Sequence, residues 1–269
     1  MKKKEKTIFS LLCVAALVLT MFVGCAAAPA ADNTTTEEQT ERPLPNITNK
    51  NVRFVGHSIW WYNGRVLAAG VGGGEKAKGY QTLLKERYNF GSMSNYCYSG
   101  YSLGGVRNTD SKSIMLSEAD SWIATEGDLW TLDTITNDFR RNIAIGTMDD
   151  YTNATGITTY YGALRAFADR VLQLSGKDAV VVCANAVRRN NDGYTSTSAN
   201  MHGHTMQDYG KALKEVAEKN HWYFVDQFNC EITDENVGMY TIDGLHLNNE
   251  GYLLAIKPWF ELLDTMVGG

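Results

Sequence analysis

The chain has 269 residues, of which 44% are hydrophobic and 20% are charged. This length and balance suit a single globular domain with a full hydrophobic core, and they exclude a chain that is disordered throughout. The formal net charge is -5 at pH 7. Because no basic stripe follows the lysine-rich start, nucleic acid is not an expected partner.

The first 24 residues have the pattern of an export signal. A lysine-rich start precedes an apolar run that is too short to be a comfortable membrane span. The run ends in "FVGC" (22–25), which resembles the bacterial lipobox, although Phe22 stands where leucine is commoner. The resemblance implies a lipoprotein that is anchored through Cys25 on the extracytoplasmic face of a membrane. The alternative is a secreted protein that is cut nearby.

Residues 25–50 are rich in Ala, Thr, Glu and Pro and contain few large apolar residues. Such a segment buries too little surface to offset the entropy lost on ordering, so we expect a disordered tether. The globular domain is then predicted to cover residues 51–269.

From residue 51 on, short apolar runs alternate with amphipathic ones. Five runs have the length and composition of strands: 52–56, 94–99, 128–135, 178–185 and 222–228. Four segments have apolar residues three and four apart, as in helices: 75–89, 158–176, 205–220 and 250–267. Pro258 should kink or split the last of these. The alternation predicts an α/β fold of three layers, with a five-stranded parallel sheet between helices.

In such sheets, reactive groups collect at the carboxyl ends of the strands. Reading those ends gives "GHSIWW" (56–61), "YSGYSLGG" (98–105) and "TITNDF" (134–139), and "DGLHLN" (243–248) precedes the last helix. These four blocks, in this order, resemble those of the SGNH (GDSL-type) hydrolases. The resemblance covers 51–269 and implies a flavodoxin-like fold and a serine ester hydrolase that needs no cofactor.

Carried over residue by residue, the resemblance makes Ser58 the nucleophile, His246 the base and Asp243 the carboxylate that orients the base. The backbone N–H groups of Ser58 and Gly100 and the side-chain amide of Asn137 would form the oxyanion hole. The chemistry fits these residue types. A serine hydroxyl needs a neutral imidazole beside it, a carboxylate on the far ring nitrogen fixes the tautomer, and preorganised donors stabilise the oxyanion.

One residue departs from the family pattern. The family usually has aspartate before the serine, whereas this chain has His57. The hydrogen bonds that the aspartate makes around the nucleophile turn must therefore be made differently. His57 is also a rival base for Ser58, although neighbouring side chains at such a turn usually point in different directions.

Each block also has a purely structural interpretation. Asn137 and Asp138 could cap a helix, and the "DGLHLN" block could be a turn in which Asn248 or Asn249 caps the last helix. Asp226 could rival Asp243, but it is expected to hold loop backbone instead.

The remaining motifs predict no catalytic or metal-binding residues. The glycine run "GVGGGEK" (70–76) lacks the Gly-Lys-Ser/Thr of a phosphate loop and is expected to form a loop beside the site. His202 and His204 have no partners at metal-ligand spacing, and no metal site is predicted. Cys97 and Cys183 lie in apolar runs and are expected to be buried, inert thiols.

Trp60 and Trp61 follow the nucleophile block directly, and an exposed ring there would stack on a sugar or an acyl chain. The favoured substrate is an O-acyl ester, chiefly O-acetyl, of extracellular carbohydrate. The alternatives are a lipase or lysophospholipase-type esterase, and a glycan-binding surface protein whose catalysis is impaired.

Overall fold

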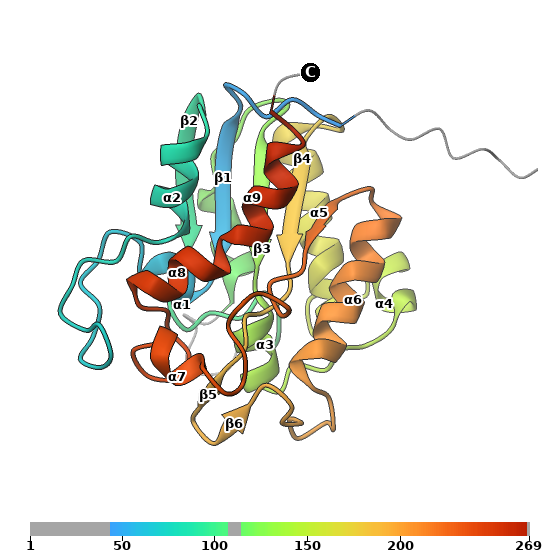
Figure 1. The fold of residues 1–269 in the computed structure, drawn as a ribbon. Helices are drawn as coiled ribbons and strands as arrows, with labels where there is room; N and C mark the ends of the chain where they lie inside the picture. Colours follow the sequence, from blue (N-terminus) through green and yellow to red (C-terminus); the bar gives the residue numbers. More distant parts are fainter. Residues whose placement is uncertain (1–43, 107–113, 268–269) are drawn as a thin grey trace, which may run out of the picture. The chain divides into compact units, whose positions relative to one another are not determined.

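The computed structural model describes residues 44–106 and 114–267 of the chain. Within these residues, five parallel strands form one sheet in the order β2-β1-β3-β4-β7 (Figure 1). Their bounds are β1 Asn51–Gly56, β2 Ser92–Cys97, β3 Leu129–Asp133, β4 Val180–Ala184 and β7 Tyr223–Val225. All five lie within or overlap the predicted strands, and the predicted three-layer α/β fold is confirmed.

The longer helices also lie where the periodicity placed them. Their bounds are α2 Tyr80–Arg87, α5 Tyr160–Ser175, α6 Met206–Lys219, α8 Asn249–Ala255 and α9 Lys257–Asp264. The predicted break at Pro258 is confirmed, because one residue, Ile256, separates the end of α8 from the start of α9 and the proline lies in the first turn of α9. None of the helices in the described parts of the chain is long and apolar enough to cross a bilayer.

The shorter elements did not show in the sequence pattern. They are α1 Ser58–Trp61, a 3₁₀ helix over Met115–Ser121, α3 Ile135–Arg140, α4 Met148–Thr152, α7 Val237–Tyr240, and the hairpin of β5 Asn190–Asn191 and β6 Tyr194–Thr195. One or two turns are too short to reveal a period of 3.6 residues. Two of these helices, α1 and α3, begin within two residues of the ends of β1 and β3.

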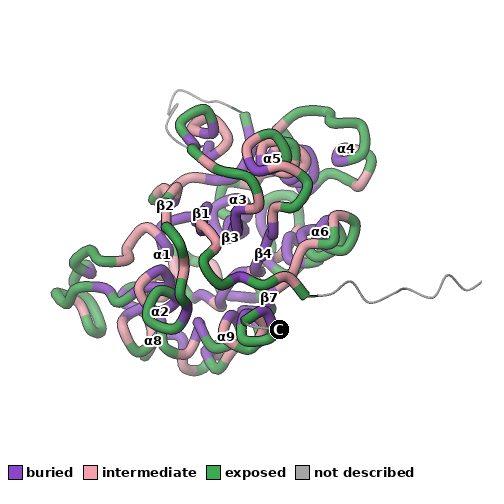
Figure 2. Tube along the Cα trace, turned by 90° about the horizontal axis from the view of Figure 1, so that it is seen from above, coloured by how far each residue is buried: buried purple, intermediate pink, exposed green. Residues whose placement is uncertain are grey.

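Side chains of the sheet alternate between two cores, as the period of a strand requires. On β1, Val52 and Phe54 join the core that contains residues of α2, α8 and α9, whereas Val55 joins the core of α3, α5 and α6. On β4, Val182 and Cys183 divide in the same way. Figure 2 shows the central strands β3 and β4, which are buried throughout, between the two helical layers. Both faces of these two strands are covered, so their sequences are largely apolar, whereas the edge strand β2 is more polar and more exposed.

The packed domain starts before residue 51. Ile47 is fully buried, and its N–H donates to the carbonyl of Met266 at 3.0 Å. The N–H of Asn49 donates to the carbonyl of Asn89 at 2.7 Å. Residues 44–50 therefore pack against the domain, although their composition grouped them with the tether. The burial of Ile47, an apolar residue in a mostly polar stretch, holds this segment in place. The rest of the predicted tether, the signal segment and Cys25 lie outside the described residues.

This packing gives a stability test at the start of the domain. Ile47→Ala should lower the free energy of unfolding by about 2–5 kcal/mol, the usual cost of emptying a buried isoleucine site. Leu44→Ala is the matched control, because Leu44 is 52% exposed and should change the free energy by no more than about 0.5 kcal/mol. Urea unfolding followed by circular dichroism measures both variants. Equal, small effects would show that residues 44–50 do not belong to the folded unit.

Candidate active site

Ser58 lies where the first strand meets a helix. It is the first residue of α1, two residues after the end of β1, and is 5% exposed. β1 lies between β2 and β3, and the chain passes from one side of β1 to the other between these two strands. Ligands of open α/β sheets bind at such a switch point, outside the carboxyl ends of the strands.

His246 comes to Ser58 from the other end of the domain. Its Nε2 lies 2.7 Å from the Ser58 Oγ, although the two residues are 188 positions apart in the sequence. A second hydrogen bond joins the same two segments, because the Tyr252 hydroxyl on α8 donates to the carbonyl of Ile59 on α1. The segment that carries His246 is therefore tied to the helix that carries Ser58.

Asp243 completes a hydrogen-bonded row with His246 and Ser58. Its Oδ2 lies 2.7 Å from His246 Nδ1, and its Oδ1 accepts the N–H groups of Leu245 and His246 at 3.0 and 2.8 Å. Burial opposes ionisation of Asp243, but the bonds from the His246 ring and from the two N–H groups outweigh it and lower the pKa of Asp243. An ionised carboxylate only accepts, so the proton of a neutral His246 ring lies on Nδ1 and the bare Nε2 faces Ser58.

The tight turn between Asp243 and His246 depends on Gly244. Its φ is +82°, and a Cβ at this position would lie 1.8 Å from the carbonyl oxygen of Asn190. The same turn is closed by the bond from the Ile242 N–H to the His246 carbonyl at 2.8 Å. A residue with a side chain is therefore excluded here on steric grounds. The structural interpretation of this block holds too, because the Asn248 side chain caps α8 by accepting the Gly251 N–H.

Gly100 and Asn137 lie beyond the ends of the two strands that flank β1. Gly100 is three residues past the end of β2 and has a φ of +78°, with open space where a Cβ would be. Asn137 lies in α3, four residues past the end of β3, and is 6% exposed. The Asn137 Nδ2 donates to the carbonyl of Tyr101 at 2.8 Å, which ties the two blocks together. One amide hydrogen of Asn137 remains for another acceptor.

The expectation that Asn137 and Asp138 might cap a helix is wrong, because both lie inside α3 and Thr134 holds the N-cap position. Asp138 instead binds the glycine block. Its carboxylate accepts the Leu103 N–H at 2.9 and 3.1 Å and the Gly104 N–H at 3.4 Å. Burial raises the pKa of Asp138 to about 7, and the N–H bonds only partly oppose it.

The two tryptophans differ. Trp60 is fully buried among Phe54, Tyr80 and Trp259, so its predicted role in substrate binding is wrong. The first three residues of α1 are all buried, and the ring of Trp60 packs into the core of α2, α8 and α9. Trp61 is partly exposed, and the guanidinium of Arg65 lies 3.9 Å from its ring centroid.

An aromatic residue that contacts His246 was missing from the predicted site residues. The ring of Tyr62 meets the ring of His246 edge to face, with 5.1 Å between the centroids. Its position after the two tryptophans was visible in the sequence, but not which of the three rings would face His246. Tyr62 also begins the glycine-rich loop, and that loop bonds to the segment after His246, since Asn248 Nδ2 donates to the Val71 carbonyl at 3.3 Å.

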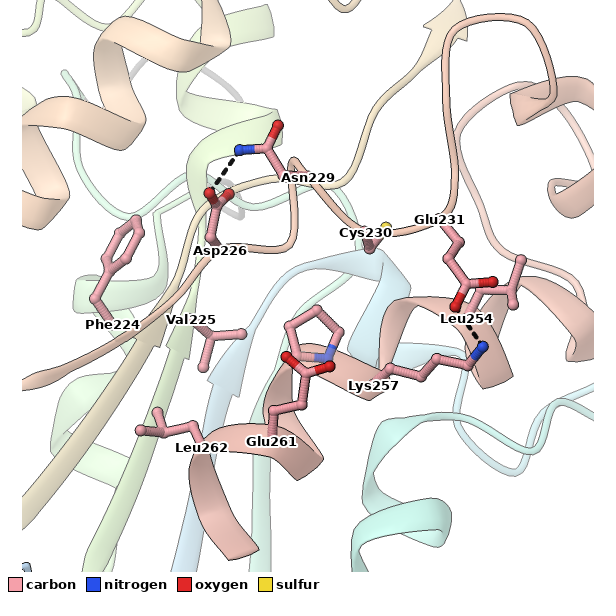
Figure 3. Close-up of a pocket in the computed structure, with 11 residues that line it drawn as sticks. Phe224, Val225, Asp226, Asn229, Cys230, Glu231, Leu254, Lys257, Glu261 and Leu262 are labelled. Atoms are coloured by element: carbon pink, nitrogen blue, oxygen red, sulfur yellow. Dashed lines mark hydrogen bonds and ion pairs between the residues drawn. The ribbon is translucent and has the colours of Figure 1, made fainter. Parts of the chain in front are cut away.

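The remaining candidates lie apart from Ser58. Asp226 accepts the side-chain amides of Asn185 and Asn229, at 2.7 and 2.6 Å, so it holds loop side chains rather than His246. It lines a hollow of about 370 Å³ beside β7 and α9 (Figure 3), whose lining does not include Ser58, Asp243 or His246.

Neither the histidine loop nor the cysteines join the row. His202 Nε2 bonds to the carbonyl of Asn142 at 3.0 Å. Residues 44–106 and 114–267 contain no group of three or more His, Cys, Asp or Glu side chains arranged to hold a metal ion. Cys97 and Cys183 are free and buried, as expected, and burial raises the pKa of both thiols.

A hydrogen-bonded row of hydroxyl, imidazole and carboxylate is an arrangement that recurs in hydrolases that transfer acyl groups. The sequence matches the model of the GDSL-like Lipase/Acylhydrolase family over residues 54–254. The match covers most of the chain, so this protein belongs to that family and is an ester hydrolase.

Solved structures share the fold. A "possible lipase" from Chitinophaga pinensis DSM 2588 is 20% identical, with a TM-score of 0.62 over 80% of this chain and 98% of that one. The aryl esterase of M. smegmatis is 12% identical, with a TM-score of 0.53 over 81% and 100%. A member of the lipolytic G-D-S-L family from Veillonella parvula DSM 2008 is 15% identical, with a TM-score of 0.52 over 80% and 98%. Comparison with curated proteins gives no match.

The raised pKa of Asp138 makes stability depend on pH. An unfolded aspartate ionises near its ordinary value of 3.8, whereas the folded protein holds the proton up to about pH 7. The stabilisation is therefore complete below about pH 4 and is lost as the pH rises through 7, with about 4 kcal/mol as the upper limit. Relative to Asp138→Asn, the wild-type free energy of unfolding should fall between pH 4 and 8.

Chemical unfolding at pH 4.5, 6 and 8 measures this difference. Asp178→Asn, which changes an exposed carboxylate, is the matched control. A wild-type curve that runs parallel to that of Asp138→Asn over the whole range would contradict the assignment.

Proposed function

We propose that this ester hydrolase is a serine esterase that removes O-acyl groups, chiefly O-acetyl, from extracellular carbohydrate. The observation that carries the proposal is the continuous row from Ser58 Oγ through both nitrogens of His246 to Asp243, with 2.7 Å at each step. Such a row supplies a nucleophile, a base and an orienting carboxylate in one geometry.

In the proposed mechanism, His246 Nε2 takes the proton of the Ser58 hydroxyl while the Oγ attacks the ester carbonyl carbon. The tetrahedral intermediate carries its negative charge on the former carbonyl oxygen, which the N–H groups of Ser58 and Gly100 and the free amide hydrogen of Asn137 would stabilise. His246 then gives its proton to the departing alcohol, which leaves an acyl-Ser58 ester. A water molecule then attacks the acyl carbon while His246 takes its proton, and His246 returns this proton to the Ser58 Oγ as the acyl–oxygen bond breaks and the acid leaves.

The proposed sugar side of the substrate is supported by aromatic rings beside the row. Tyr62 contacts His246, and its ring also meets that of Trp61 at 5.4 Å between centroids. Flat aromatic faces suit the apolar faces of sugar rings. The proposed location supports the same substrate. We infer export from the N-terminal pattern and anchoring through Cys25 on the extracytoplasmic face of a membrane, where extracellular polymers are accessible.

A lipase or lysophospholipase-type esterase is the second candidate. Two apolar side chains of the loop after Tyr62 favour it, because Val66 is 66% exposed and Val71 is 54% exposed. An exposed apolar rim would suit a long acyl chain. The third candidate, a glycan-binding protein with impaired catalysis, has less support, because the histidine before Ser58 leaves the hydrogen bond between Ser58 and His246 in place.

Acetate release from acetylated glycans tests the proposal. The wild type should release acetate, and Ser58→Ala should lower kcat by at least about 10³-fold, because no other nucleophile lies in the row. A fluorophosphonate probe should label the wild type and not Ser58→Ala. A series of model esters from acetyl to octanoyl separates the first two candidates. Equal acetate release by both proteins would refute the esterase mechanism, and a folded but unlabelled wild type would favour the binding protein.

The partly exposed Trp61 ring provides a second test. If this ring contacts the sugar, Trp61→Ala should raise the KM for an acetylated saccharide by about 5–30-fold, equivalent to about 1–2 kcal/mol, with little change in kcat. The KM for 4-nitrophenyl acetate, which lacks a sugar, should stay within about twofold and serves as the matched control. An unchanged KM for the saccharide ester would reject the stacking role.

A further inference from the structure

The residue before Ser58 is a buried histidine, His57, which lies at the N-cap position of α1. His57 is fully buried and precedes the first residue of α1, and its Nδ1 accepts the N–H of Ile59 at 3.4 Å. The first N–H groups of a helix have no partner within the helix, and a side-chain acceptor at the N-cap supplies one. In most helices this acceptor is an oxygen, whereas here it is a ring nitrogen.

The other ring nitrogen of His57 fixes which proton the ring carries. Nε2 lies 3.1 Å from the Oδ1 of Asp133, which is 2% exposed. The Oδ2 of the same carboxylate accepts the Nε1–H of Trp60 at 2.9 Å and the Nε2–H of Gln227 at 3.2 Å. A carboxylate that meets donors on both oxygens acts as an acceptor. His57 therefore donates from Nε2, and its Nδ1 is left bare to face Ile59.

Asp133 also explains why an aspartate would be unsuitable at position 57. The register of β1 and β3 places Gly56 opposite Asp133, so the last side chain of β3 lies beside the nucleophile turn. Two carboxylates in contact in a buried space repel each other, and one of them would have to take up a proton. A neutral imidazole avoids this, because it accepts at one end and donates to the carboxylate at the other.

We propose that His57 is a positioning residue for Ser58: its neutral imidazole, oriented by Asp133, caps α1 and keeps the Ser58 hydroxyl within hydrogen-bond distance of His246. The proposal rests on the function proposed above, in which Ser58 is the nucleophile. Asp133 contributes by holding the ring of His57, and neither side chain needs to touch the substrate.

Three variants test the role of His57 in turnover. His57→Leu fills the space without an acceptor and should lower kcat for 4-nitrophenyl acetate and the rate of fluorophosphonate labelling by about tenfold or more, with KM within about twofold. His57→Asn keeps an acceptor and a donor and should recover most of the loss. His221→Asn, at an exposed histidine far along the chain, is the control and should match the wild type.

A charge-swapped pair tests the role of Asp133. His57→Asp alone places two carboxylates together and should lose at least about tenfold in kcat. Adding Asp133→Asn gives the new cap a neutral neighbour that can donate, so the double variant should be faster than His57→Asp. If His57→Leu is folded and unimpaired, if Asn and Leu at position 57 are equally slow, or if the double variant gains nothing, the proposal is overturned.

A readout that does not depend on turnover separates this proposal from the proposed function. In ¹⁵N-histidine NMR spectra of the wild type, assigned with His57→Asn, the His57 ring should be neutral and protonated at Nε2. A ring protonated at Nδ1 would overturn the cap. A wild-type protein that neither hydrolyses esters nor reacts with the probe would instead overturn the proposed function, while the NMR result would still decide whether His57 is the cap.

Discussion

The hydrogen bond between Ser58 and His246 depends on the register of the parallel sheet. Neither residue is in the sheet, yet both positions follow from it. Pairing of β1 with β3 fixes the turn that carries Ser58, and the packing of α8 and α9 on the same core as Val52 and Phe54 brings the segment with His246 over that turn. Closing a contact across 188 positions is entropically costly, so the apolar layer beneath it must supply the free energy. The distance between Ser58 and His246 therefore depends on the packing of the hydrophobic core.

The carboxyl edge of the sheet is unusually rich in buried polar groups. His57, Asp133 and Asp138 are each no more than 2% exposed, and each meets hydrogen-bond partners from a neighbouring segment. Buried polar groups are costly unless they are satisfied, and satisfied networks hold loops in one geometry. Asp138 holds the glycine block after β2, and Asp133 holds the turn after β1. One carboxylate at the end of β3 therefore holds the turn that carries Ser58, and a second one, in α3, holds the glycine block after β2.

Much of this arrangement could be predicted from the sequence, and the failures have physical causes. The longer helices could be predicted because their apolar residues repeat over several turns, and the central strands because they are short apolar runs between such helices. Ser58, Asp243 and His246 could be found because their blocks resemble those of a known family. The burial of Trp60 could not be predicted, because α1 is a single turn and gives no period. The partnership of His57 with Asp133 depends on strand register, which a single sequence does not specify.

The chain enters the domain near the amino end of β1, whereas Ser58 follows the carboxyl end of this strand. Ile47 bonds to Met266 just before β1 begins, whereas Ser58 follows the other end of this strand, which is about 20 Å long (Figure 1). Ile47 and Ser58 therefore lie toward opposite ends of β1, so residues 44–50 pack against the domain away from the carboxyl ends of the strands, where Ser58 and His246 meet.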